Sequence, residues 1–187
     1  GTSATLLGVG SVNMSIQGSA VAVGIDGGNG KDEISNEGSI TVTAVSTIET
    51  DSIAVSGFGA AEVNDGEFDG STTATAAAVG IYTGNSKDEV LGISNSSTID
   101  VQATASVNAD SYALTFAGDA ITDTSLTATA FAEGIGSGCG KDTIANEGTL
   151  TVGASAAVDS FSFDLNLLDI FKSKADLEAA AAAVGID

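Results

Sequence analysis

The fold is decided by residues 27–42, which read GGNGKDEISNEGSITV, because related blocks recur along the chain. Residues 84–101 read GNSKDEVLGISNSSTIDV, and residues 138–152 read GCGKDTIANEGTLTV. The Lys-Asp pairs that begin at residues 31, 87 and 141 are 56 and 54 residues apart. Self-similarity at a fixed period is typical of repeat architectures. The chain is therefore expected to consist of repeats of about 55 residues.

The repeats divide residues 1–187 into a single array. We expect a partial repeat at 1–19, repeats at 20–73, 74–127 and 128–181, and the start of a further repeat at 182–187. The sequence thus enters and leaves in mid-repeat. Two explanations stay open here: a slice of a longer array, or open ends that complete one another between copies.

Period-two alternation follows each recurring Asn turn. From Ile99 to Val107, apolar residues alternate with Asp, Gln, Thr and Ser, and residues 40–44 and 150–156 show the same pattern. Such alternation predicts half-buried strands. We therefore expect an all-β fold, a β-solenoid or parallel β-helix. Because a solenoid coil is often about 20 residues long, each repeat is expected to form two or three coils. Tandem small antiparallel β units are the alternative.

One region departs from the repeat. Residues 164–178 contain a run of Leu and Ile, and an Ala run follows at 179–183. Read in isolation, Ser173 could cap a helix through Ala183. The repeat alignment instead places the end of the Ala run on a strand. We expect a helical or looped insertion within 164–178 and a strand by Ala182.

The charge balance restricts the partners. There are 25 acidic residues, five Lys, no Arg and no His, which gives a net charge of −20. Nucleic acids and anionic surfaces are bound by clustered Lys or Arg, so cations are the expected small partners and nucleic acid is not. No apolar run is long enough for a membrane-spanning helix. The absence of His removes the usual general base.

Residues 27–35 match the pattern G-G-x-G-x-D-x-U-x at every defined position. The block resembles the calcium-binding nonapeptides of the RTX family of secreted bacterial proteins, and the two later blocks match in part. The resemblance covers about nine residues per repeat and implies Ca²⁺ as a bound ion. The residues it points to as metal-site residues are Gly28, Gly30, Asp32, Gly84, Asp88, Gly138, Gly140 and Asp142. A plain tight turn is the alternative.

Three further features have simpler explanations. The acidic loop at 64–70 is a second cation candidate, although its occurrence in only one repeat favours a solvated loop. Asn36, Asn95 and Asn146 occupy one repeat position, where Asn can bond its own backbone within a turn. The lone Cys139 stands where the other copies carry Asn, which indicates an ordinary turn residue.

These observations favour a non-enzymatic, extracellular or cell-surface structural protein. It would act as a rod or adhesin segment, or as a self-assembling filament subunit that joins copies head to tail as a homo-oligomer or polymer. One alternative is a calcium-binding module that folds or stiffens on Ca²⁺. A second is a polysaccharide-active β-helix enzyme, which the absence of Arg and the scattered Lys disfavour.

Overall fold

The computed structural model describes residues 1–28, 30, 32–65, 72–84, 92–138, 142–168 and 171–187, without the side chains of 64, 65, 171 and 172. Within these residues the chain forms strands and turns, and no helix occurs. The strands are β1 (Thr2–Leu7), β2 (Gly10–Asn13), β3 (Gln17–Asp26), β4 (Glu33–Asn36), β5 (Ile40–Phe58), β6 (Ala61–Asp65), β7 (Thr72–Tyr82), β8 (Gly92–Asn95), β9 (Ile99–Ala117), β10 (Ala120–Gly136), β11 (Thr143–Asn146), β12 (Leu150–Asn166) and β13 (Phe171–Ile186).

The strands form three sheets in which every described pair is parallel. Sheet A has the order β1-β5-β9-β12, and the short sheet C has the order β4-β8-β11. Sheet B has the order β2-β6-β10-β7-β3, and β13 also pairs with β10. The expected all-β character is confirmed, whereas the antiparallel alternative is wrong.

Equivalent residues of successive blocks lie side by side. Ile40 pairs with Ile99, and Ile99 pairs with Leu150. The register then continues residue by residue from Ile40 to Ser56. The expectation that two or three coils form each repeat is wrong, because no strand lies between these partners. The long strands explain the error: β5 and β9 each have 19 residues, which is about the length expected for a whole coil.

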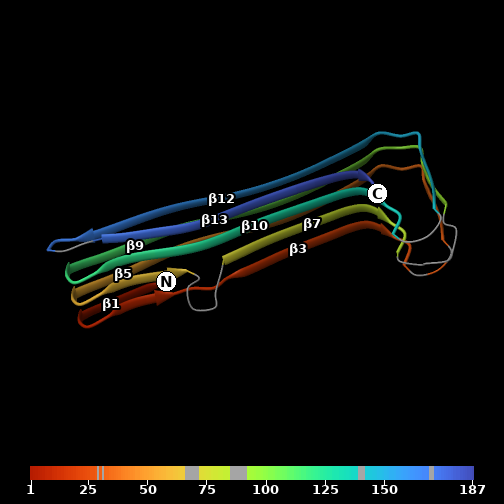
Figure 1. Cartoon of the computed structure of the whole chain (residues 1–187). Coiled ribbons are helices and arrows are strands. Elements are labelled where there is room, and N and C mark those ends of the chain that lie inside the picture. Colours follow the sequence, from red (N-terminus) through yellow and green to blue (C-terminus); the bar gives the residue numbers. More distant parts are fainter. Residues whose placement is uncertain (29, 31, 66–71, 85–91, 139–141, 169–170) are drawn as a thin grey trace.

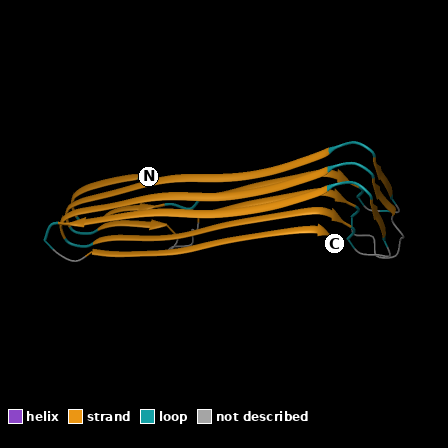
Figure 2. Ribbon diagram, turned by 90° about the horizontal axis from the view of Figure 1, so that it is seen from above, coloured by secondary structure: helices purple, strands orange, loops and turns teal. Residues whose placement is uncertain are grey.

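Sheets A and B lie against each other, and sheet C closes one end of the pair (Figures 1 and 2). We call the part next to sheet C the proximal half and the part far from it the distal half. In sheet A the proximal half comprises residues 40–48, 99–107 and 150–158, and in sheet B it comprises 17–26, 72–82, 126–136 and 177–186. The distal half comprises residues 2–7, 49–58, 108–117 and 159–166 of sheet A and 10–13, 61–65, 120–124 and 171–175 of sheet B.

The proximal half contains the main apolar core. Val42, Ile99 and Val101 of sheet A are buried against Ala76 and Ile81 of sheet B. The β-branched and Ala side chains that point inward alternate with outward Thr, Ser and acidic residues, as expected for strands with one buried face. The sequence prediction of half-buried strands in this region is confirmed.

The distal half turns at a column of glycines. Gly8, Gly59 and Gly118 all have positive φ, at 110°, 124° and 129°. A Cβ atom at Gly59 would collide with the carbonyl oxygen of Gly8, and one at Gly118 would collide with that of Gly59. Glycine therefore permits both the backbone conformation and the close stacking of these turns.

The region after Asp164 corrects a further prediction. β12 continues to Asn166 and β13 begins at Phe171, so most of the expected insertion at 164–178 is strand, and only the connection between these two strands leaves room for a loop. The strand at Ala182 is confirmed, because Ala182 pairs with Phe131 of β10. Alanine favours helices when isolated. Here the exposed edge of β10 supplies backbone partners along the whole of 171–186, and this pairing outweighs the local preference.

Candidate functional site

The recurring Asn residues form a column inside the turn. The Nδ2 atom of Asn36 donates to Oδ1 of Asn95 at 2.7 Å, and Nδ2 of Asn95 donates to Oδ1 of Asn146 at 2.6 Å. Asn95 also donates to the carbonyl of Ser97 at 2.9 Å, which is the turn bond expected from the sequence. Because Asn95 is only 1% exposed, its hydrogen bonds stabilise the stack rather than recognise a ligand.

The predicted metal-site glycines adopt turn conformations. Gly28, Gly30, Gly84 and Gly138 have φ values of 79°, 139°, 92° and 73°. A Cβ at Gly84 would collide with the carbonyl of Gly28, so the first two turns stack directly. Asp88 and Gly140 lie outside the described residues, as do Cys139 and residues 66–70 of the acidic loop. The direct stacking of the Gly28 and Gly84 turns shows that the expected separation of two or three coils between these turns is wrong.

Two carboxylates of the predicted site carry buried oxygens. Asp32 Oδ2 and Asp142 Oδ1 are inaccessible to solvent and have no hydrogen-bond partner. Such atoms normally find a partner, so each is a position where a cation or a water would be favourable. Among the described residues, no three His, Cys, Asp or Glu side chains gather closely enough to hold a metal ion.

The interior of the distal half is polar where β12 faces β10. Asp164 points inward at the register position that Ala113 and Ala54 occupy in the preceding strands. Its Oδ2 accepts a hydrogen bond from Thr122 Oγ1 at 3.2 Å, whereas its Oδ1 is buried without a partner. Burial raises the pKa of Asp164, and the Thr122 hydrogen bond partly opposes this. Thr124, which is fully buried, also has an unpartnered hydroxyl.

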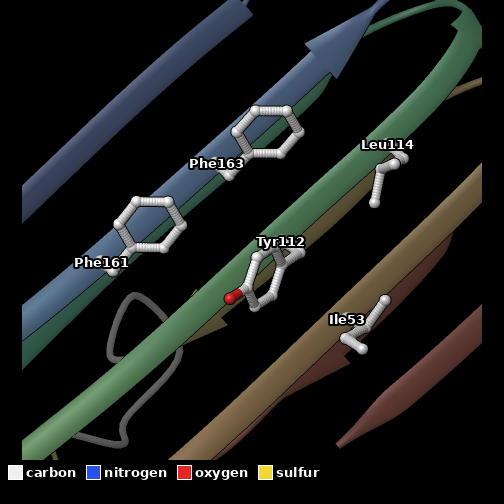
Figure 3. Close-up of a pocket in the computed structure, with 5 residues that line it drawn as sticks. All are labelled: Ile53, Tyr112, Leu114, Phe161 and Phe163. Carbon is white, nitrogen blue, oxygen red and sulfur yellow. The ribbon is translucent and has the colours of Figure 1, made fainter.

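The outer face of the distal half carries a feature that sequence analysis missed. An apolar groove of about 470 Å³ lies across three neighbouring strands of sheet A. Figure 3 shows its side chains on one side of the sheet, supplied by β5, β9 and β12. The lining residues are Ile53, Tyr112, Leu114, Phe161 and Phe163.

Register places these residues in rows that run across the strands. Ile53, Tyr112 and Phe163 form one row, and Val55 and Leu114 belong to the next row. The rings of Tyr112 and Phe161 lie 5.8 Å apart between centroids, and those of Tyr112 and Phe163 lie 6.5 Å apart. A second groove continues the surface toward the glycine turns. Its lining residues are Val55, Ser56, Leu114, Thr115, Phe116, Leu165 and Leu167.

The grooves leave large apolar side chains in contact with water. Phe161 is 52% exposed, Phe163 is 43% exposed and Leu167 is 62% exposed. Single exposed apolar residues are common on proteins, but a contiguous patch indicates a surface that meets a partner. The first groove is lined by aliphatic and aromatic side chains, with the Tyr112 hydroxyl as its polar group.

A detectable sequence signal precedes the groove. In β9 the apolar residues occupy odd positions up to Ala109, and the large ones then occupy even positions at Tyr112, Leu114 and Phe116. A continuous strand keeps its odd and even residues on opposite faces, so the switch places the large residues on the outer face.

In the part of the chain that the structure describes, there is no apolar helix of membrane-spanning length. Comparisons with protein-family models, curated proteins and solved structures found no match for this chain.

Proposed function

We propose that the chain is a segment of a β-solenoid in which each repeat of about 55 residues contributes one coil. The observation that carries this proposal is the unbroken register between equivalent blocks, in which Ile40, Ile99 and Leu150 are successive neighbours. The Asn36–Asn95–Asn146 column supports it, because identical side chains bond one another when coils stack in register.

The function that this architecture supports best is structural and non-enzymatic. Each added coil lengthens the stack by about 4.8 Å and covers the open edge of the coil before it. We infer a rod or adhesin segment of an extracellular or cell-surface protein. The charge of −20 keeps such a surface soluble, and the sequence has neither His nor Arg for a catalytic set.

Duplication of residues 74–127 tests the solenoid. If one repeat is one coil, the longer chain gains stability because the added coil contributes a further interface with its neighbours. Urea denaturation should then show one cooperative transition at a higher midpoint. Two separate transitions, one of them at the original midpoint, would refute the proposal because the added repeat would have formed its own unit.

Head-to-tail joining of copies is a proposal within the same function. In this chain β12 is the last strand of sheet A, and its free edge can accept a further parallel strand. Removal of residues 1–19 deletes β1 and β2, which lie at the opposite end of the stack. Particle length, measured by electron microscopy before and after the deletion, should fall. Unchanged polymer length would contradict head-to-tail joining.

Calcium binding is a second candidate, favoured by the buried and unpartnered oxygens of Asp32 and Asp142. A cation that binds only the folded chain raises its stability. Calorimetric titration with Ca²⁺ should release or absorb heat, and the melting temperature should fall when a chelator is added. Asp32→Asn should weaken both effects, whereas the exposed Glu37→Gln should not. No heat and no melting shift would eliminate this candidate.

A further inference from the structure

The outer face of the distal half combines two kinds of row. Next to the apolar row of Ile53, Tyr112 and Phe163 lies a mixed row, in which Asp51 and Asp110 are followed by Phe161. The following row contains Glu49 and Asp159, with Asn108 between them. All four carboxylates stand at the outward positions of their strands, so this face changes from apolar to acidic along the strands, with Phe161 at the boundary.

We propose that this face, from Glu49 and Asp159 to the two grooves, binds a basic amphipathic polypeptide segment. Apolar side chains of the segment occupy the grooves, and its Lys or Arg side chains lie over the acidic rows. An amphipathic helix with a basic flank presents such parallel stripes. The inference goes beyond the structural role, because it concerns the partner that this face binds and does not depend on whether copies join head to tail.

Charge complementarity selects this occupant. The strands β1, β5, β9 and β12 contain no Lys or Arg, so they supply no basic side chain to the carboxylates of the acidic rows. Complementary potential steers association and suppresses partners of like charge. A second copy that presents its own sheet A is disfavoured as the occupant, because its sheet A carries the same acidic rows and no Lys to pair with them.

Aromatic anchors make the groove the centre of the proposed interface. Tyr112 on β9 is the register partner of Phe163 on β12, and its ring packs against the rings of both Phe161 and Phe163. Partly exposed aromatic side chains supply large contact areas at low cost in conformational entropy, and such residues dominate interface energies. The acidic rows then act as the rim, where charge sets the association rate and its dependence on salt.

The test uses the full chain and a synthetic helical peptide of Leu and Lys, about 14 residues or four turns long. Binding is measured by fluorescence anisotropy of the labelled peptide at low and at physiological salt. One control peptide keeps every Lys and replaces Leu with Ser. A second control keeps every Leu and replaces Lys with Glu. We expect the native chain to bind the Leu and Lys peptide at least about tenfold more tightly than either control.

Two variants dissect the face, and each has a matched control. The groove variant combines Tyr112→Ser with Phe163→Ser, and its control combines Val21→Ser with Val23→Ser, two exposed apolar residues of sheet B. The border variant alters the carboxylates that lie next to the apolar row, and it combines Asp51→Asn with Asp110→Asn. Its control combines Glu37→Gln with Glu147→Gln, which removes the same charge from exposed positions near sheet C. Circular dichroism and melting curves verify that each variant folds.

We expect the groove variant to lose at least about tenfold in affinity and the border variant about fivefold, with a smaller salt dependence, while both controls stay within about twofold. Equal losses in the charge control would overturn the proposal, because binding would then follow net charge alone. An unaffected groove variant or no binding by the native chain would also overturn it. So would concentration-dependent dimers that the groove variant abolishes, since a second copy would then be the occupant.

Discussion

The proximal and distal halves of the same strands place their large side chains on opposite faces. In the proximal half of β9, Ile99, Val101 and Val107 are buried, and the outer face is polar. In the distal half, the inner positions carry small or hydroxyl side chains, whereas Tyr112 and Leu114 face outward. One continuous strand therefore serves two purposes, a sealed core at one end and an apolar outer surface at the other.

The distal half closes around a smaller apolar cluster, which consists mostly of Ala with Val12 and Val63. Ala54, Ala61 and Ala113 are fully buried there, and inward hydroxyls bond to the turns. Ser56 Oγ donates to the carbonyl of Gly8 at 3.0 Å, and Thr115 Oγ1 donates in the same way to Gly59 at 3.0 Å. The comparison predicts that the two halves respond differently to equivalent substitutions.

The largest effect is expected for loss of a proximal core side chain. Ile99→Ala removes a fully buried side chain and should lower the free energy of unfolding by about 2–5 kcal/mol. Leu114→Ala, at an outward position of the same strand, should cost about 1 kcal/mol or less. Urea denaturation of both variants measures the difference. Similar losses in the two halves would show that Leu114 belongs to a core, which contradicts the comparison.

A larger side chain should disturb the distal interior. Ala54→Leu adds volume where Ala54 is fully buried between thin layers, and overpacking should cost about 1–3 kcal/mol. The neighbouring Val55→Leu, which points outward, is the matched control and should be nearly neutral. Chemical denaturation of both chains provides the measurement. A neutral Ala54→Leu would mean that the distal interior has empty space.

The pH dependence of stability sharpens the comparison at Asp164. Since burial raises the folded pKa of Asp164 above its ordinary value of 3.8, the folded chain binds this proton more tightly than the unfolded chain. The stability that the protonated Asp164 carboxyl contributes is fully present when the pH is below the ordinary pKa. It is lost as the pH rises through the pKa of the folded chain. Asp164→Ala, which matches Ala54 and Ala113, should therefore stabilise the chain by about 1 kcal/mol at neutral pH, where it also removes an unpartnered buried oxygen.

This gain should shrink on acidification to about pH 3, as seen in denaturation curves recorded at several pH values. The exposed Asp159→Ala controls for the loss of one negative charge from the same strand. An Asp164→Ala gain that does not change with pH would show that the carboxyl has no linked titration.

The smallest effect on stability is expected on the outer distal face. Ile53→Thr, at a position 37% exposed, should change the free energy of unfolding by less than about 0.5 kcal/mol. The same change should reduce the fluorescence of a neutral apolar dye that binds the grooves, whereas Val45→Thr in the proximal half should not. Unchanged dye fluorescence in Ile53→Thr would mean that the groove does not bind apolar molecules.

Sequence reasoning identified the strands where apolar and polar residues alternate, because alternation after Asn36, Asn95 and Asn146 is a local signal. It gave the wrong number of coils per repeat, since strand length depends on where the sheets turn and not on the period itself. The sequence predicted that these Asn residues bond their own backbone, but it did not predict the bonds between their side chains, because those bonds join residues 59 and 51 positions apart. The groove was missed because it depends on the shift of large residues from inner to outer positions at Tyr112, which matters only once register is known.

The most direct test of the stacked register is disulfide trapping between β5 and β9 in a Cys139→Ser background. Thr47→Cys and Ser106→Cys face each other as register partners, and adjacent strands lie about 4.8 Å apart, which permits a disulfide. Thr47→Cys with Asp110→Cys, four residues further along β9, is the mismatched pair. We predict rapid intramolecular crosslinking, identified by mass spectrometry, of the first pair only. Failure of that pair, or equal crosslinking of both, would contradict one coil per repeat, since strands two or three coils apart would lie about 10–14 Å from each other.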